Sequence, residues 1–138
     1  MVVRLITPAL VVIALAVAGC TSSSGSGSSA KFTGAEGEVA KVVADLQKDG
    51  ERKDAQKICS DILARSLVDR LSDAGTSCAQ EMDKAISDAD DFDLSVQKVT
   101  VNGSSATAVV RRGDDGPTAT FRFVREGGKW KATDFGAS

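Results

Sequence analysis

The feature that most constrains the fold of this chain is a change in hydrophobic period close to Asp90 and Asp91. Before this point, apolar residues recur every three or four positions, a spacing that places them on one face of a helix. After it, apolar and polar residues alternate, which is typical of strands with one buried face. Helices followed by an antiparallel sheet predict the α+β class, with the N-terminal helices packed on one face of a curved, four-stranded meander.

Three helical segments are predicted before the change in period. The first spans residues 36–48 and ends near Gly50. Its apolar stripe consists of Val39, Val42, Val43 and Leu46. The second begins near Lys53, and a change in the phase of its apolar residues predicts a break between Ala64 and Ser66. We expect the hydroxyl of Ser66 to cap the short helix that follows the break.

The third helical segment is predicted from Cys78 to about Ala89, with Ser77 as its cap and with Met82 and Ile86 facing inward. A capping box places its acid three residues after the cap. The first acid after Ser77 is Glu81, which lies four residues away. We therefore expect Glu81 to contribute little to capping this helix.

Four strands separated by glycine-containing turns are predicted after the change in period. The strands are Leu94–Val101, Ala106–Arg111, Thr118–Arg125 and Lys129–Phe135. The turns are Asn102-Gly103, Gly113-Asp114-Asp115-Gly116 and Gly127-Gly128.

These turns predict which residues face each other across the strands. A tight turn at Asp114-Asp115 pairs Val110 with Ala119, Ala108 with Phe121, and Ala106 with Phe123. A turn at Gly127-Gly128 pairs Phe123 with Ala132 and Arg125 with Trp130, a plausible cation–π pair. Both registers put the apolar residues on the same side, so the meander should bury one face.

Large and small residues alternate across this apolar face. The gap beside the small alanines must be filled by the helices or form a pocket. The candidate pocket residues are Phe121, Phe123, Trp130 and Asp134. Asp134 is included because the register places it on the apolar face, opposite Phe121.

The first residues of the chain have the organisation of a bacterial export signal. Arg4 supplies a positive charge, and Leu5–Val17 is apolar. Val17-Ala18-Gly19-Cys20 resembles the lipobox of bacterial lipoproteins, which implies cleavage between Gly19 and Cys20 and a diacylglycerol on the Cys20 thiol. Because a membrane span needs about 20 apolar residues, an uncleaved anchor is a weaker alternative, as is ordinary secretion.

The chain is therefore divided into three parts. Residues 1–19 are interpreted as a lipoprotein signal peptide, residues 20–34 as the lipidated Cys20 with a flexible Ser/Gly tether, and residues 35–138 as one folded domain. More than one acyl chain makes membrane anchoring stable. We therefore expect the domain to lie on the extracytoplasmic face of the cell membrane.

Two further cysteines, Cys59 and Cys78, remain in the folded part. In an exported chain, a structural disulfide between them is the expected state. A redox-active pair is less favoured, because such pairs usually have Cys-x-x-Cys spacing. Free thiols are the third alternative.

The composition excludes several functions. The chain has no histidine, which rules out histidine-dependent triads and histidine-ligated zinc. Its formal net charge of −2 offers no basic excess for nucleic acid. An acidic turn consists of Asp88, Asp90, Asp91 and Asp93, but it lacks the glycine and distal glutamate of a calcium-binding EF-hand loop. We therefore expect no metal, cofactor or nucleic-acid partner.

The order of elements, together with three short motifs, resembles the NTF2-like superfamily, also called SnoaL-like or cystatin-like. The motifs are Ile58-Cys59-Ser60, Ser77-Cys78-Ala79 and residues 121–131, which contain the Gly-Gly turn and Trp130. The chain looks closest to small lipoproteins of this type from high-GC Gram-positive bacteria. The resemblance implies a cone, in which a bent sheet wraps around helices and its mouth holds a ligand.

Three functional hypotheses follow. The first is a non-catalytic module that binds a small apolar ligand or a partner, and the second is docking on another envelope protein through the exposed face of the sheet. The third is a small SnoaL-like enzyme that uses a buried Asp134 as its base. Enzymatic members of the superfamily use pocket carboxylates, tyrosine or histidine, and the chain lacks both tyrosine and histidine. We therefore do not expect an enzyme.

Overall fold

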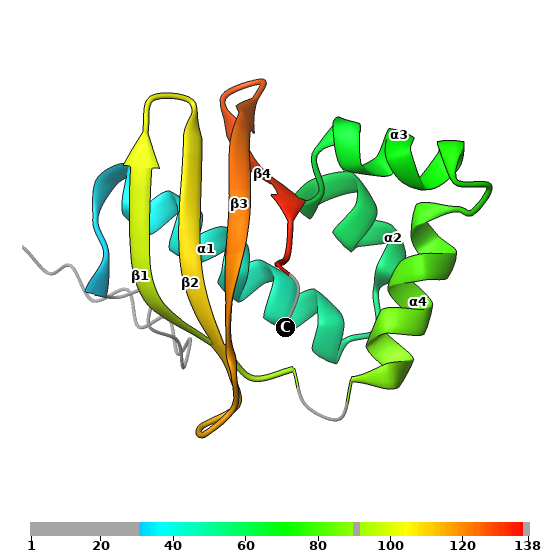
Figure 1. Ribbon diagram of the computed structural model, residues 1–138, viewed down its shortest axis with the longest axis horizontal. Coiled ribbons are helices and arrows are strands. Elements are labelled where there is room, and N and C mark those ends of the chain that lie inside the picture. The colour runs from blue at the N-terminus through cyan, green and yellow to red at the C-terminus, as the bar shows by residue number, and fades with distance from the viewer. Residues whose placement is uncertain (1–30, 90–91, 137–138) are drawn as a thin grey trace, which may run out of the picture.

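The computed structural model of the protein describes residues 31–89 and 92–136, so the predicted leader, Gly19 and Cys20 lie outside the described residues. The helical elements are α1 (Gly34–Glu51), α2 (Ala55–Lys57), the π-helical turn η2 (Ile58–Ile62), α3 (Arg65–Asp73) and α4 (Cys78–Asp88). The antiparallel sheet contains, in spatial order, β1 (Leu94–Asn102), β2 (Ser105–Arg112), β3 (Thr118–Glu126) and β4 (Lys129–Asp134). The predicted α+β class is confirmed, and Figure 1 shows α1 crossing one face of the sheet.

Helix α1 extends beyond the predicted segment at both ends and buries three of the four residues of the predicted stripe, while Val42 is half-buried. Val39, Val43 and Leu46 are buried, and the helix packs on β1, β2 and β4. Gly50 lies inside the last turn, and a Cβ added there would lie 2.3 Å from the ring of Phe92. The missing side chain at Gly50 therefore lets Phe92 close over this end of α1.

None of the described helices is long and apolar enough to span a membrane.

The predicted break after the second helical segment is confirmed. Leu63 and Ala64 are extended, with ψ angles of 142° and 146°. The backbone N–H of Ala64 donates a hydrogen bond of 2.8 Å to the carbonyl of Ala132 in β4. The helical segment stops here because the chain pairs briefly with the edge of the sheet.

The prediction that Ser66 caps the next helix is wrong. The N-cap of α3 is Ala64, which has no side chain able to accept a hydrogen bond. Instead, the carboxylate of Glu126, at the end of β3, accepts a hydrogen bond of 2.8 Å from the backbone N–H of Arg65. A residue distant in sequence thus satisfies one free N–H group at the start of α3.

Helix α4 begins with a capping box that the sequence interpretation missed. The hydroxyl of Ser77 accepts a hydrogen bond of 3.2 Å from the backbone N–H of Gln80. In return, the side-chain oxygen of Gln80 accepts one of 3.4 Å from the N–H of Ser77. The prediction rested on Glu81 alone, whereas glutamine at the preceding position provides the acceptor that the motif needs.

The predicted registers across β2, β3 and β4 are confirmed. The observed pairs include Ala108–Phe121, Ala106–Phe123, Phe123–Ala132 and Arg125–Trp130. The guanidinium carbon of Arg125 lies 4.7 Å from the centroid of the Trp130 ring, as expected for a cation–π contact. The apolar members of these pairs are buried, and the sheet therefore has one core face.

The predicted position of Asp134 on the core face is wrong. A register shift between Arg122 and Phe123 pairs Asp134 with Arg122, and Asp134 is exposed. Phe135 packs against Phe121 instead, with ring centroids 5.1 Å apart in an edge-to-face arrangement. Burying an unpaired carboxylate is costly, whereas burying an aromatic ring is favourable. The shift is therefore favourable, because it places Phe135 and not Asp134 on the core face.

The two edges of the sheet differ. At the edge formed by β4, Ala132 is bridged by Leu63 in parallel orientation. The other edge is formed by β1, a strand of nine residues whose pairing with β2 is irregular between Val96 and Lys98. The side chain of Lys98 is exposed.

Candidate functional site

An apolar cavity of about 440 Å³ lies between α1, α4 and the sheet. This volume falls within the range of small-molecule sites, roughly 300–1,000 Å³. The lining residues are Leu46, Ile58, Met82, Ala85, Ile86, Asp88, Ala89, Phe92, Leu94, Arg112, Phe121 and Phe135. Most of these side chains are apolar, so the cavity is suited to a ligand with a largely apolar surface.

Hydrogen bonds hold the segment that leads into β1 beside the cavity. The side-chain oxygen of Gln47 in α1 accepts a hydrogen bond of 3.1 Å from the N–H of Leu94. The carbonyl of Asp93 accepts one of 2.8 Å from the N–H of Gly113. Together with the contact between Phe92 and Gly50, these bonds fix one wall of the cavity to α1 and to the end of β2.

The aromatic wall of the cavity comes from the sheet and the residue after it. Phe121 is 2% exposed, and its ring meets that of Phe135. Phe135 is partly buried and packs against the core cluster. The edge-to-face pair gives the cavity a firm apolar surface, because such aromatic pairs add stability beyond the area they bury.

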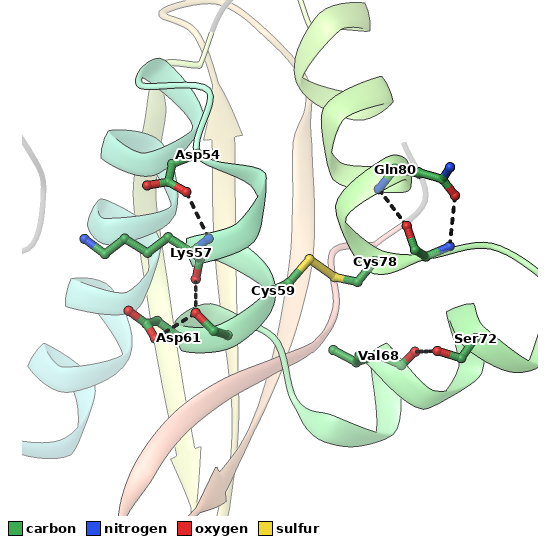
Figure 2. Close-up of a disulfide and its surroundings, with 10 residues drawn as sticks. Asp54, Lys57, Cys59, Asp61, Val68, Ser72, Cys78 and Gln80 are labelled. Carbon is green, nitrogen blue, oxygen red and sulfur yellow. Dashed lines mark hydrogen bonds between the residues drawn. A yellow bond between two sulfur atoms is a disulfide. The ribbon is translucent and has the colours of Figure 1, made fainter.

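The opposite wall is held by the disulfide between Cys59 and Cys78 (Figure 2). The predicted pairing is confirmed, with Cα atoms 6.0 Å apart. Cys59 lies in η2 next to Ile58, and Cys78 begins α4, which carries Met82 and Ile86. The disulfide therefore joins two elements that both contribute to the cavity.

The charged lining residues are Asp88 and Arg112. They have opposite charges, and no ion pair joins them to each other or to another described residue. One positive and one negative charge give the described part of the lining no net charge. The arrangement therefore favours a neutral ligand over a strongly acidic or basic one.

The structure does not bring the predicted pocket residues together. Phe121 lines the cavity, whereas Phe123 is 2% exposed and belongs to the core. Trp130 lines a separate cleft on the other side of η2, and Asp134 is exposed.

Sequence reasoning missed Phe92 and Phe135 as lining residues. The register shift that brings Phe135 inside has no pattern in the sequence, whereas Met82 and Ile86 were predicted to face inward.

No group of three or more potential metal ligands occurs within residues 31–89 and 92–136. Two members of the acidic turn, Asp90 and Asp91, lie outside those ranges.

Comparison with known proteins identifies no relative. No protein-family model matches the chain, and no curated protein or solved structure is significantly similar to it. The resemblance to the NTF2-like superfamily therefore stays a prediction.

Proposed function

We propose that this protein is a membrane-anchored lipoprotein of the extracytoplasmic face, whose NTF2-like domain binds a small, largely apolar ligand without catalysis. The observation that carries the proposal is the cavity of about 440 Å³ with its predominantly apolar lining. Ligand sites of this kind use apolar walls for affinity and a few polar groups for orientation. Asp88 and Arg112 are the charged groups available for that second task.

The proposed location rests on the leader and on the disulfide. Val17-Ala18-Gly19-Cys20 has the residues required for lipid transfer and cleavage. The Cys59–Cys78 disulfide supports export, because structural disulfides persist mainly in oxidising compartments.

Mass spectrometry of the protein from the membrane fraction tests this location. The expected chain begins at Cys20 and carries diacylglycerol on its sulfur. A chain that still begins at Met1, or an unmodified Cys20, would contradict lipid anchoring.

The absence of catalysis is proposed from the chemistry of the cavity. General acid–base catalysis needs a titratable group within hydrogen-bonding reach of the reacting atoms. Among the described lining residues the cavity offers one carboxylate, that of Asp88, and the chain contains no histidine or tyrosine. The candidate base Asp134 is exposed and is not a lining residue, although the next residue, Phe135, is one.

Binding of a neutral apolar dye, 1-N-phenylnaphthylamine, to a soluble domain of residues 31–138 tests the proposed function. The variant Ala85→Phe would place a ring in the cavity, and we expect the affinity for the dye to fall at least about tenfold, or about 1.4 kcal/mol. Ser87→Phe is the matched control, because Ser87 is also exposed on α4 but does not line the cavity.

Equal dye binding by both variants would contradict the assignment of the cavity as the binding site. If only Ala85→Phe loses the dye, native mass spectrometry of the gently purified wild type should then reveal the mass of a co-purifying ligand.

Docking of an envelope protein on the outer face of the sheet has less support. A docking face would be expected to present a contiguous apolar patch. The exposed residues of that face are mainly polar or charged: Lys98, Thr100, Thr107, Thr118, Thr120 and Arg122.

A further inference from the structure

A second cleft, independent of the apolar cavity, lies between α1, the α2–η2 segment and β4. Its volume is about 550 Å³. Val42, Ile62 and Trp130 form the apolar part of its lining, and nine charged residues and Gly128 form the rest. Five of the charged residues lie along one face of α1, where the distance from Glu38 to Lys48 is about 15 Å at the helical rise. The cleft is therefore elongated.

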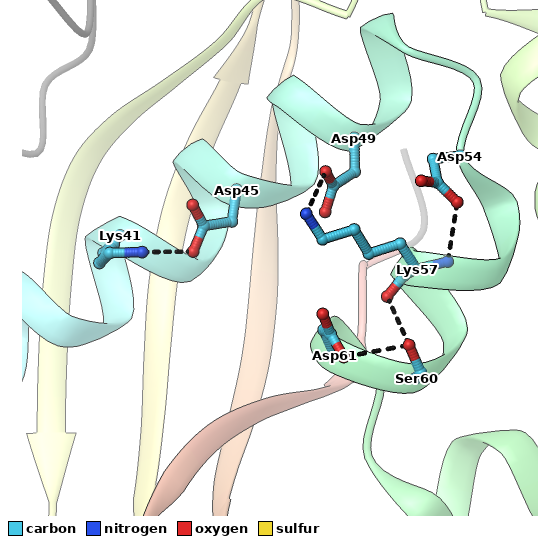
Figure 3. A network of polar contacts seen from close by, with 7 residues as sticks. All are labelled: Lys41, Asp45, Asp49, Asp54, Lys57, Ser60 and Asp61. Atoms are coloured by element: carbon cyan, nitrogen blue, oxygen red, sulfur yellow. Dashed lines mark hydrogen bonds and ion pairs between the residues drawn. The ribbon is translucent and has the colours of Figure 1, made fainter.

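Two of the four acidic lining residues are already paired with lysines inside the cleft (Figure 3). Asp45 Oδ2 lies 2.7 Å from Lys41 Nζ. Asp49 Oδ1 lies 3.5 Å from Lys57 Nζ, and the Asp49 side chain is only 3% exposed. These two carboxylates and their partners leave no net charge.

The other two acidic residues also have partners. Glu38 Oε2 accepts a hydrogen bond of 3.1 Å from the indole N–H of Trp130 and forms an ion pair with Arg125. A carboxylate oxygen of Asp61 accepts a hydrogen bond of 3.0 Å from the hydroxyl of Ser60. Each acidic group of the cleft thus has a partner within the protein, but the carboxylate of Asp61 is bonded only to a neutral hydroxyl and keeps its negative charge.

The lysines are not all matched in this way. Lys131 Nζ donates to the carbonyls of Ser60 and Asp61, at 3.2 and 2.5 Å, and so keeps its charge without a carboxylate partner. Within the described part of the chain, Lys48 and Lys129 have neither a hydrogen bond nor an ion pair from their ammonium groups. Five lysines against four acids give the lining a charge of +1, whereas the whole chain carries −2.

The positions of the two free lysines define what would fit between them. Lys129 precedes Trp130, whose indole N–H reaches Glu38 near the start of α1. Lys48 lies near the other end of α1. The two lysines therefore join the lining from opposite ends of α1, and Lys131, on β4, reaches the carbonyls of η2.

We propose that this cleft binds an elongated anion bearing phosphate groups, held at its ends by Lys129 and Lys48 and between them by Lys131. Charge-assisted hydrogen bonds from ammonium groups are strong contacts for such oxygens. The half-buried side chain of Val42 contacts the body of the ligand, next to the small part of Trp130 that lines the cleft. The phosphate groups come either from a soluble phosphate ester or from lipid headgroups beside the anchored domain, and both present the same oxygens.

A length series of inorganic polyphosphates, beginning with orthophosphate, tests the proposal on the full chain in a nonionic detergent. Trp130 is the only tryptophan and lines the cleft, so its fluorescence reports binding, with calorimetry as the second readout. Affinity should rise with chain length until the anion spans the cleft and then level off. Lys48→Ala and Lys129→Ala should each weaken binding of the long anions about tenfold, the value of one charge-assisted contact.

The matched control is the pair Lys84→Ala and Lys98→Ala, which removes the same charge from exposed positions outside the cleft. Unchanged binding in this pair, with loss in the cleft variants, would support the site. Equal weakening in both pairs would mean non-specific attraction and would overturn the proposal, as would the absence of binding in calorimetry. Because the four lysines are exposed and form no ion pair, all these variants should fold.

Mixed detergent micelles with and without phosphatidylglycerol distinguish the two sources of phosphate. Binding to phosphatidylglycerol micelles that requires both Lys48 and Lys129 would identify headgroups as the source. Binding of soluble polyphosphate alone, with the same dependence, would identify a soluble ester. The dye assay at the apolar cavity reports the other site, so failure of one proposal is distinguishable from failure of the other.

Discussion

Removal of the Cys59–Cys78 disulfide should destabilise the domain by about 3 kcal/mol. The two cysteines are separated by 19 positions, and the chain-entropy relation for a closed loop of roughly that length gives about 3 kcal/mol at 25 °C. In a domain of about 100 residues, 1 kcal/mol corresponds to roughly 4–8 °C, so the melting temperature should fall by on the order of 12–24 °C. The variant Cys59→Ala/Cys78→Ala avoids placing a new hydroxyl at the buried Cys78.

Urea unfolding of residues 31–138, followed by Trp130 fluorescence, measures this loss. Trp130 is 4% exposed in the folded domain and is the only tryptophan, so its emission should change on unfolding. Dithiothreitol provides an internal control: it should lower the stability of the wild type to that of the double variant and leave the variant unchanged. Dye binding should weaken in parallel, because the disulfide joins two walls of the apolar cavity.

A loss below about 1 kcal/mol would refute this reasoning, since it lies well under the loop-closure value. It would mean that contacts between η2 and α4, and not the covalent link, hold the two elements together. A change in the urea dependence of unfolding, without a change in midpoint, would instead locate the effect in the unfolded chain.

Four further substitutions test the packing and the caps by the same urea assay or by calorimetry. Trp130→Ala should lower the free energy of unfolding by about 3–5 kcal/mol, as large core truncations do. Its unfolding is followed by circular dichroism, because the fluorophore is lost. A cost below about 1 kcal/mol would contradict the register of β4. Gly50→Ala should cost about 1–3 kcal/mol through overpacking against Phe92, and a stabilised variant would show that Phe92 moves away freely. Ser77→Ala should lower the free energy of unfolding by about 1 kcal/mol through loss of the capping box. Ser66→Ala, at a residue that caps no helix, should change it by less than about 0.5 kcal/mol. Equal losses would contradict the assignment of the caps.

The sheet was largely predictable because its turns and its alternation agree. A turn centred on Gly127-Gly128 pairs Phe123 with Ala132 across the two strands. Because side chains alternate between the two faces of a strand, the same pairing is the one that puts the apolar residues on one face. The turn before β2 is less well predicted. Pairing of Asn102 with Ser105 places Gly103 and Ser104 at its centre, one residue later than the predicted Asn102-Gly103.

The candidate site was predicted less well, because it depends on features without a local pattern. The register shift beside Arg122 exchanges Asp134 for Phe135 on the core face, and nothing in the alternation before it indicates the shift. The contact of Glu38 with Trp130 joins residues 92 positions apart. A single sequence predicts which faces are apolar, but the spaces left between packed faces depend on the three-dimensional arrangement.

If the proposed lipid anchor holds this domain on a membrane, the edge of the sheet formed by β1 has a consequence for neighbouring copies. Anchored molecules are confined to two dimensions and meet far more often than molecules in solution, and a bare strand edge can then template the addition of a strand from a neighbour. The irregularity between Val96 and Lys98 interrupts the row of backbone groups in β1, and the Lys98 ammonium would have to be desolvated at the junction. Crowded on a surface, the domains should therefore remain separate, each with its apolar cavity and its charged cleft accessible.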